Sequence, residues 1–348
     1  FINQYIKPNA DAFFSCVVQA YLKHCGLDVD ECHIDGTKFE AKSNKYKVVW
    51  KPITLHLKLS DKIRTLLAEL SLSEGIPVEG IIPANLVAAK LKEASALSAL
   101  TPVEQKKLSR QLEDLTKYLS KSLEYEEKER ICGPDRNSYY KTDHDATAMC
   151  MKEDYYSGLG SNFRAAYQVQ AVVSHGFIVG YYISQDRADM RTFVPTLERF
   201  YEIHGKYPKR ITADSEYGCL ENYLFCQDHD IEGYLKYPAW QGECSGRRPA
   251  LYELNADDTI TCLSGRTGYK TEIPGRHRKY KGSALFEVKC MNKCPFKLYC
   301  RRLLKIKTGR TRVFEVNLEY QRQKQQARDR LLSVKGIEMR VNRSCQVE

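Results

Sequence analysis

Within residues 166–236 the spacing of apolar residues switches repeatedly between a strand-like and a helix-like period. This pattern constrains the fold of the chain more than any other feature. Residues 167–173 and 177–183 are strand-like runs joined by the turn sequence Ser174-His175-Gly176. Two strands joined this tightly are antiparallel neighbours. Beyond this hairpin, helical and strand periods alternate, which predicts a sheet with helices packed against it.

The elements around the hairpin follow in a regular order. The spacing of apolar residues from Met190 to Phe200 predicts an amphipathic helix that Gly205 ends. An earlier strand is expected over residues 32–40. Later elements are expected at residues 210–214 (strand), 221–227 (helix) and 231–235 (strand). Strand, hairpin, helix, strand, helix, strand is the order of an RNase H-like α/β domain, which is the fold class we predict.

The other segments predict additions to this domain. We expect an N-terminal helical remnant over residues 1–31, in which Phe13, Phe14, Val17, Val18, Tyr21 and Leu22 share one face of a helix. Residues 51–165 predict a helical insertion followed by an irregular connection. Within it, Thr101-Pro102-Val103-Glu104 is a capping box with Pro at the first helical position. Residues 237–316 form a basic, Cys-containing insertion, so the catalytic core is expected in residues 32–50, 166–236 and 317–348.

The net charge of +10 is unevenly distributed along the chain. Residues 236–348 contain 25 Lys and Arg but 11 Asp and Glu, whereas the remainder contains 29 and 33. Such an excess favours a polyanionic partner, and the alternative is a solvated surface. If the partner is DNA, the candidate contacts are Arg276, Arg278, Lys279, Lys281, Arg301, Arg302, Arg310, Arg312, Arg340 and Arg343.

The sequence gives no sign of a membrane or of secretion. No apolar run approaches the roughly 20 residues that span a bilayer, and no signal peptide is recognisable. We therefore expect a cytoplasmic protein, associated with the nucleoid if its partner is DNA. The first residue is not Met and the last is a Glu within a motif, so we expect the natural protein to extend beyond both ends.

Two acidic residues occupy positions that suit metal chemistry. Asp35 lies in the first predicted strand, and Asp214 ends a later one before the turn at Gly218. In α/β sheets the ends of neighbouring strands face a common crevice, so these carboxylates could meet there. Two or three carboxylates can hold a pair of Mg²⁺ ions about 4 Å apart. A single Asp is more often a cap, and the competitors on the same grounds are Asp143, Asp145, Asp186 and Asp189.

Five blocks of sequence carry a resemblance to a known family. They are His33–Tyr46, Lys141–Thr147, Ala166–Val172, Ile211–Gly218 with Glu221–Tyr223, and Arg340–Glu348. Together they resemble the transposases of the 1182 family of bacterial insertion sequences, related to the insertion-sequence 4 and 5 families, and they occur in that family's order. In related families a Tyr and an Arg precede the final Glu at positions that here hold Val341 and Ser344, and Arg343 stands one place early.

The resemblance implies an RNase H-like fold and a DDE triad that binds Mg²⁺ or Mn²⁺. Carried over by position, the triad is Asp35, Asp214 and Glu348. It also implies cut-and-paste movement of an element bounded by inverted repeats, with DNA ends and target DNA as partners and a homodimer on the DNA. Because Glu348 ends the chain, we expect its helix to lack support and the 348-residue chain to cut poorly.

A cysteine cluster in the basic insertion indicates a second metal. Thirteen cysteines are many for a chain without a signal peptide, and core packing or metal binding are their usual uses in a reducing compartment. Four thiolates can close a tetrahedral Zn²⁺ site, and the alternative is free thiols. The candidate ligands are Cys262, Cys290, Cys294 and Cys300.

Three functions remain open on the sequence alone. The first is a DDE transposase that cleaves DNA and transfers strands. The second is an RNase H-like nuclease or resolvase that only hydrolyses DNA. The third is a domesticated protein that binds DNA without cutting it, although the intact Asp35, Asp214 and Glu348 argue against it.

Overall fold

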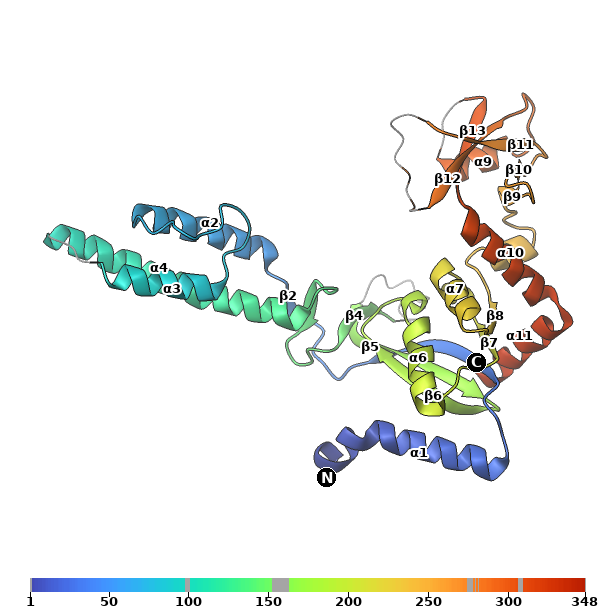
Figure 1. Ribbon diagram of the computed structural model, residues 1–348, viewed down its shortest axis with the longest axis horizontal. Coiled ribbons are helices and arrows are strands. Elements are labelled where there is room, and N and C mark those ends of the chain that lie inside the picture. Colours follow the sequence, from blue (N-terminus) through green and yellow to red (C-terminus); the bar gives the residue numbers. More distant parts are fainter. Residues whose placement is uncertain are drawn as a thin grey trace. The chain divides into compact units, whose positions relative to one another are not determined.

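A computed structural model describes residues 2–97, 101–151, 163–273, 278, 280, 282–305 and 309–347. The chain divides into two compact units, which we call the core unit (Phe1–Thr37 with Gln168–Glu348) and the helical unit (Lys38–Tyr167). Their architecture mixes helices and sheets, as expected of the α/β class (Figure 1). Within the described residues, no helix combines the length and the apolar character needed to cross a membrane.

The main sheet is built around β1 (Glu31–Glu40). On one side β1 pairs in parallel with β7 (Arg210–Ala213), which pairs in parallel with β8 (Glu232–Leu235). On its other side lies β5 (Phe163–Ser174), which forms the expected antiparallel hairpin with β6 (Phe177–Ser184). His175 and Gly176 make the turn at φ values of 51° and 78°, a conformation that glycine adopts without strain. The hairpin prediction is confirmed.

Helices of the core unit cover this sheet. Their bounds are α1 (Lys7–Cys25, after a π-helical turn at Ile2–Ile6), α6 (Phe193–His204), α7 (Leu220–Asp228), α10 (Leu318–Leu332) and α11 (Val334–Gln346). Short 3₁₀ turns at Asp189–Arg191 and Ser215–Tyr217 connect strands to helices. Gly205 ends α6 at a φ of 66°, as predicted.

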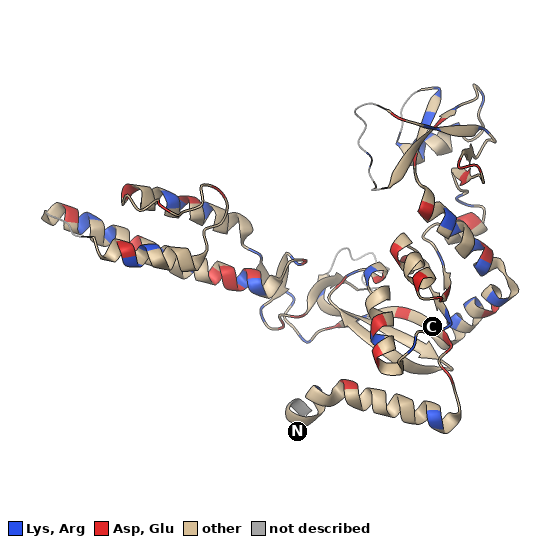
Figure 2. Ribbon diagram, viewed as in Figure 1, with Lys and Arg blue, Asp and Glu red and all other residues tan. Residues whose placement is uncertain are grey.

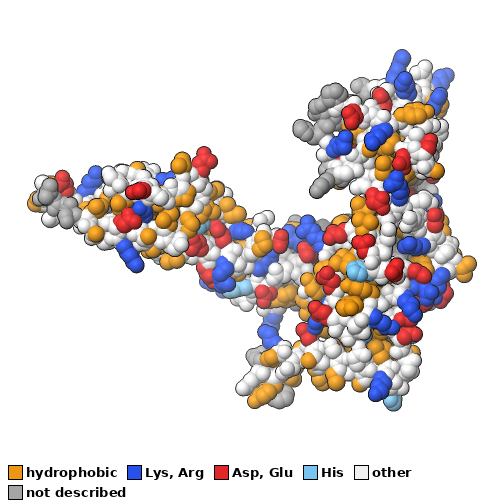
Figure 3. Space-filling view, in the orientation of Figure 1, with side chains coloured by type: hydrophobic (Ala, Val, Ile, Leu, Met, Phe, Trp, Pro, Cys, Tyr) orange, Lys and Arg blue, Asp and Glu red, His pale blue; other side chains and the backbone are white. Residues whose placement is uncertain are grey.

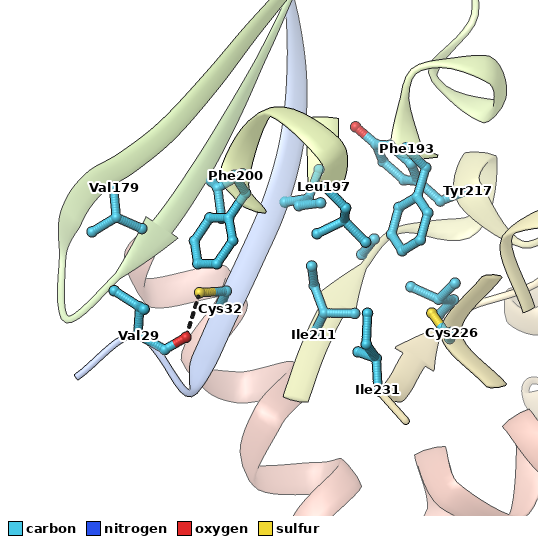
Figure 4. Packing of buried hydrophobic residues seen from close by; sticks show 14 of the residues in the cluster. Val29, Cys32, Val179, Phe193, Leu197, Phe200, Ile211, Tyr217, Cys226 and Ile231 are labelled. Atoms are coloured by element: carbon cyan, nitrogen blue, oxygen red, sulfur yellow. Dashed lines mark hydrogen bonds between the residues drawn. The ribbon is translucent and has the colours of Figure 1, made fainter. Parts of the chain in front are cut away.

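The core of this unit lies between the sheet and α6. Phe193, Leu197 and Phe200 of α6 are fully buried and belong to one cluster with Cys32 and Ile211 of the sheet (Figure 4). The amphipathic spacing therefore predicted correctly which face of α6 is buried. The corresponding prediction for α1 is partly wrong. Its Val18 and Leu22 are buried, but Phe13 and Val17 are 69% and 50% exposed because that side of the helix has no partner surface among the described residues.

The basic insertion contains a second sheet that its sequence did not predict. Among the described residues, five antiparallel strands follow one another in the order β13-β12-β11-β10-β9. They are β9 (Tyr252–Leu254), β10 (Ile260–Cys262), β11 (Thr267–Thr271), β12 (Ser283–Lys289) and β13 (Thr311–Asn317), with helices α8 (Trp240–Cys244) before them and α9 (Lys297–Leu304) between the last two. We call this the small sheet. Its own core centres on Phe286 and Phe314.

The helical unit contains α2 (Ile53–Glu69), α3 (Ala84–Ser95) and α4 (Pro102–Cys132). The capping box that begins α4 is confirmed, because Thr101 and Glu104 bond to each other's backbone N–H groups. At its base, β2 (Val48–Trp50) pairs with β3 (Ser138–Tyr140). The irregular connection expected in the later part of residues 51–165 instead contains β3 and β4 (Thr147–Cys150), and residues 152–162 lie outside the described part.

Candidate active site

Strand register brings Asp35 and Asp214 next to each other in the core unit. The parallel pairing of β1 with β7 places Cys32 opposite Ile211 and His33 opposite Thr212. The same offset, extended two residues past the last paired position, would set Asp35 beside Asp214, and Asp214 is near enough to raise the pKa of Asp35. Paired positions on adjacent parallel strands direct their side chains to the same face of a sheet. Both carboxylates therefore share one face at the carboxyl ends of these strands, where α/β sheets bind ligands.

Asp35 sits in a partly buried, charged environment. Its side chain is 28% exposed, and its Oδ2 accepts a 3.1 Å ion pair from Nη2 of Arg343 on α11. Its Oδ1 accepts the backbone N–H of Gly36 at 2.9 Å. Burial raises the pKa of Asp35 above its ordinary value, and the negative charges of Asp214 and Asp189 add to that rise, while Arg343 opposes it. A bound cation would relieve the repulsion among these carboxylates.

Asp214 is fixed by the turn that follows β7. Its Oδ1 accepts the N–H of Glu216 at 2.8 Å, so the residue caps the 3₁₀ turn that the sequence already suggested. The turn is held inward by the fully buried Tyr217. Gly218 follows, where a Cβ atom would lie 2.2 Å from the carbonyl oxygen of Lys236, so only glycine permits this close approach. Asp214 therefore caps this turn and also lies near Asp35.

A third carboxylate, Asp189, belongs to the same cluster. It is 9% exposed and accepts hydrogen bonds from Nε2 of Gln168 and, at 2.8 Å, from Nε2 of Gln170. The Tyr217 hydroxyl donates to Oε1 of Gln170, which extends the buried polar network. Sequence reasoning named Asp189 only as a competitor and missed both glutamines. The sequence did carry a signal for the glutamines. Gln168 and Gln170 alternate with apolar residues, which puts both on one face of the hairpin, the face that a helix covers.

Asp143 and Asp186, two of the other acidic candidates, form hydrogen bonds outside this cluster. Asp143, in the helical unit, accepts the Tyr167 hydroxyl at 2.7 Å and the N–H groups of Asp145 and Ala146, which is a turn-forming role. Asp186 bonds locally to Ser184. Glu348 lies outside the described residues. The helix before it, α11, nevertheless carries Arg343 to Asp35, so this part of the chain lies beside the carboxylates.

The predicted DNA contacts differ in exposure. Arg278, Arg302 and Arg310 are exposed, Arg301 is half-buried, and Arg276, Lys279 and Lys281 lie outside the described residues. Arg312 and Arg343 are 2% and 5% exposed, which corrects their assignment as surface contacts, because neither guanidinium is open to a passing phosphate. Arg340 lies over the Trp240 ring at 5.5 Å from its centroid, so its guanidinium is partly engaged by cation–π contact.

The excess of positive charge does not form a single basic patch in the views drawn. Figure 2 shows Lys and Arg on α10, on α11 and on the small sheet, with Asp and Glu among them. In the space-filling view these basic side chains are interspersed with acidic and hydrophobic ones (Figure 3). A polyanion on this face would therefore meet separate basic contacts. The uneven distribution of charge along the sequence therefore does not by itself locate a binding surface.

The carboxylate cluster has the donor chemistry that a hard divalent cation prefers. Mg²⁺ and Mn²⁺ bind carboxylate oxygens and retain water, and the charges of Asp189 and Asp214 each act on Asp35. In the described part of the chain, no three acidic, His or Cys side chains already enclose a metal-sized site, so binding would require them to draw together. No model of a known protein family matches the sequence, and no curated protein matches it either.

Proposed function

We propose that the core unit is an RNase H-like DDE domain that cleaves DNA and transfers the cut strand at the ends of an insertion sequence. The observation that carries the proposal is the register that sets Asp35 beside Asp214 on one face of the sheet. The strand order β4-β5-β1-β7-β8, with β6 also paired to β5 and with β1, β7 and β8 parallel, supports an RNase H-like domain. The exposed Arg278, Arg302 and Arg310 supply contacts for a polyanion.

The chain's own residues would divide the chemical work as follows. Asp35 and Asp214 would hold divalent ions, and the resemblance makes Glu348 the third ligand. Such ions supply Lewis acidity for in-line displacement at a phosphate. Arg343 favours the ionised form of Asp35, because its guanidinium opposes the rise in pKa that burial causes. Asp189, held by Gln168 and Gln170, packs against the backbone at Gly36, the residue that follows Asp35.

In the proposed reaction, a water oxygen attacks the phosphorus at the element end and the 3′ oxygen leaves with a proton. The freed 3′-hydroxyl then attacks a phosphate of target DNA, so that one phosphodiester forms as another breaks. Neither step needs a covalent enzyme intermediate. Two element ends must meet in one complex, so we propose that a homodimer acts on the DNA.

The decisive variant is Asp214→Asn, which keeps the size of the side chain and removes its charge. The substrate is supercoiled plasmid carrying DNA from both flanks of the gene, with Mg²⁺ present. We expect cleavage to fall at least about 100-fold, the scale seen when a group that stabilises developing charge is lost, while plasmid binding persists. The matched control is Asp186→Asn, whose carboxylate bonds only locally to Ser184 among the described residues. Wild-type cleavage by Asp214→Asn would refute the assignment.

A strand-transfer assay separates this function from the two alternatives. Labelled DNA with free 3′-hydroxyl ends is incubated with the protein, Mg²⁺ and an unlabelled plasmid. A transposase gives label covalently joined to the plasmid. An RNase H-like nuclease or resolvase gives cut DNA without joined product, and a domesticated DNA-binding protein gives a bound complex with neither.

A further inference from the structure

We propose that Cys262, Cys290, Cys294 and Cys300 bind one structural Zn²⁺ ion in the small sheet. This site is separate from the carboxylates, and it holds whether or not the core unit cuts DNA. Figure 1 shows the small sheet and α9 that carry these cysteines. The four thiols lie in one cavity, beside the buried positive charge of Arg312.

All four cysteines line one cavity of about 260 Å³. Cys262 ends β10, Cys290 follows β12, Cys294 lies in the turn before α9, and Cys300 lies within α9. Backbone hydrogen bonds anchor these positions, among them the N–H of Cys290 to the carbonyl of Arg310 at 2.7 Å. Cysteines that are distant in the sequence thus line the same cavity. Their spacing in the sequence did not by itself require this.

Arg312 gives an independent reason to expect an anionic group in this cavity. Its side chain is 2% exposed and lines the same cavity. Its Nη1 donates to the carbonyls of Gly309 and Thr311 at 3.0 and 2.7 Å, but its Nε is buried without a hydrogen-bond partner. In the residues that the structure describes, no carboxylate forms an ion pair with it, and Cys300 lies within its electrostatic reach. A guanidinium stays charged at any physiological pH, and a buried charge without a counter-charge is strongly destabilising.

Zinc thiolate chemistry supplies the missing negative charge. Neutral thiols carry no charge that could balance Arg312, whereas the thiolates that bind a metal do. When Zn²⁺ binds, four thiols release four protons to solvent and four Zn–S bonds form. The resulting centre carries a net charge of about −2, which Arg312 would offset in part. Zinc therefore satisfies the thiols and the guanidinium together.

The architecture of the small sheet explains why such an ion would be useful. Its fully or nearly buried core is small, and consists of Ile260, Ala284, Phe286, Val288, Phe314 and Val316. Small cores are often supplemented by a metal that ties loops to strands. The four sulfurs do not yet stand at chelating distance in the described residues, so the turn between Cys290 and Cys294 would close on the ion. Arg310, which lines the cavity, would be fixed by the same closure.

The first test is metal analysis of the purified full chain and of single-cysteine variants. We expect about one zinc per chain in the wild type and, by X-ray absorption, four sulfur neighbours at about 2.3 Å. Cys290→Ser and Cys294→Ser should each lose most of the zinc. The matched control is Cys244→Ser, an exposed cysteine outside the cavity, which should retain it. A wild type without zinc, iron in its place, or zinc retained by both variants would overturn the proposal.

A second measurement covers the case in which those variants fail to fold. The wild-type chain is stripped with a chelator and refilled with Co²⁺, whose visible absorption is intense only in tetrahedral thiolate sites. Alkylation followed by mass spectrometry then asks whether the four thiols react after chelation and are protected when metal is restored. Disulfides among these cysteines, or equal alkylation with and without metal, would contradict a zinc site.

Discussion

At the scale of single residues, the candidate active site depends most closely on Gly36. A Cβ atom at this position would lie 2.3 Å from Oδ1 of Asp189 and 2.5 Å from Nε2 of Gln170. Real Cβ contacts are never this short, so any side chain here would displace Asp189. Gly36 directly follows Asp35 and donates its N–H to that carboxylate. The missing side chain thus lets Asp189 and Gln170 pack against the backbone next to Asp35.

We expect Gly36→Ala to reduce DNA cleavage about 100-fold with little loss of folding, because displacement of a reacting group by about 1 Å can have an effect of this size. Cleavage rate and the thermal unfolding midpoint are measured together. The control is Gly180→Ala in β6, whose Cβ would touch Phe200 and Val172 at 3.3 and 3.4 Å, away from the carboxylates. Cleavage reduced equally by both variants would point to general instability rather than to the site.

At the scale of elements, one histidine joins three of them. His204 ends α6, and its Nε2 lies 2.8 Å from the carbonyl oxygen of Val179 on β6 and donates to it. Gln19 of α1 donates to the carbonyl of Ile203 at 3.0 Å, and its Nε2 lies 3.1 Å from Nδ1 of His204. This arrangement suits a neutral imidazole whose Nδ1 accepts. Protonation would place two donors against each other.

This geometry predicts that acid weakens the fold. Burial lowers the pKa of His204 below its ordinary value, the positive charge of Lys206 lowers it further, and the Val179 carbonyl opposes the shift. The unfolded chain therefore binds the proton more readily, so stability is full above the ordinary imidazole pKa of about 6.5 and declines as pH falls below it. Urea unfolding at about pH 7 and about pH 5 should show a smaller decline for His204→Gln. Equal declines in variant and wild type would refute this role.

At the scale of the whole molecule, each unit has its own hydrophobic core. In the helical unit, Leu59, Ile63, Leu67, Val87 and Leu115 pack together from three helices. A polar contact also lies within it, where the buried His56 reaches Glu129 at 3.0 Å and Ser122 at 3.2 Å. Regions with separate cores often open as separate cooperative units. The helical unit should therefore unfold without the main sheet.

The corresponding variant is Leu115→Ala, at a fully buried position of α4. Removing such a side chain typically destabilises by about 2–5 kcal/mol. We expect hydrogen exchange to accelerate across α2, α3 and α4 while amides of β7 and β8 keep their protection. Leu123→Ala, whose side chain is 55% exposed on the same helix, should leave both regions unchanged. Acceleration spread evenly through both units would show that they form one cooperative unit.

Local patterns in the sequence determined the elements that depend on near neighbours. The hairpin of β5 and β6, the capping box of α4 and the buried face of α6 all follow from turn chemistry and hydrophobic period, which act over a few residues. Asp35 and Asp214 were also named from their places on predicted strands. Their roles as ligands, like that of Glu348, remain predictions.

Only the tertiary structure decided which distant residues meet. The register of β1 against β7 sets Asp35 beside Asp214, and packing of the hairpin adds Asp189, Gln168 and Gln170, which no local pattern singled out. The small sheet was missed because its short strands pair with one another without a clear period. Burial of Arg343 was missed because an arginine's charge can be read from sequence, whereas the counter-charge that holds it inside, Asp35, lies far away in the chain.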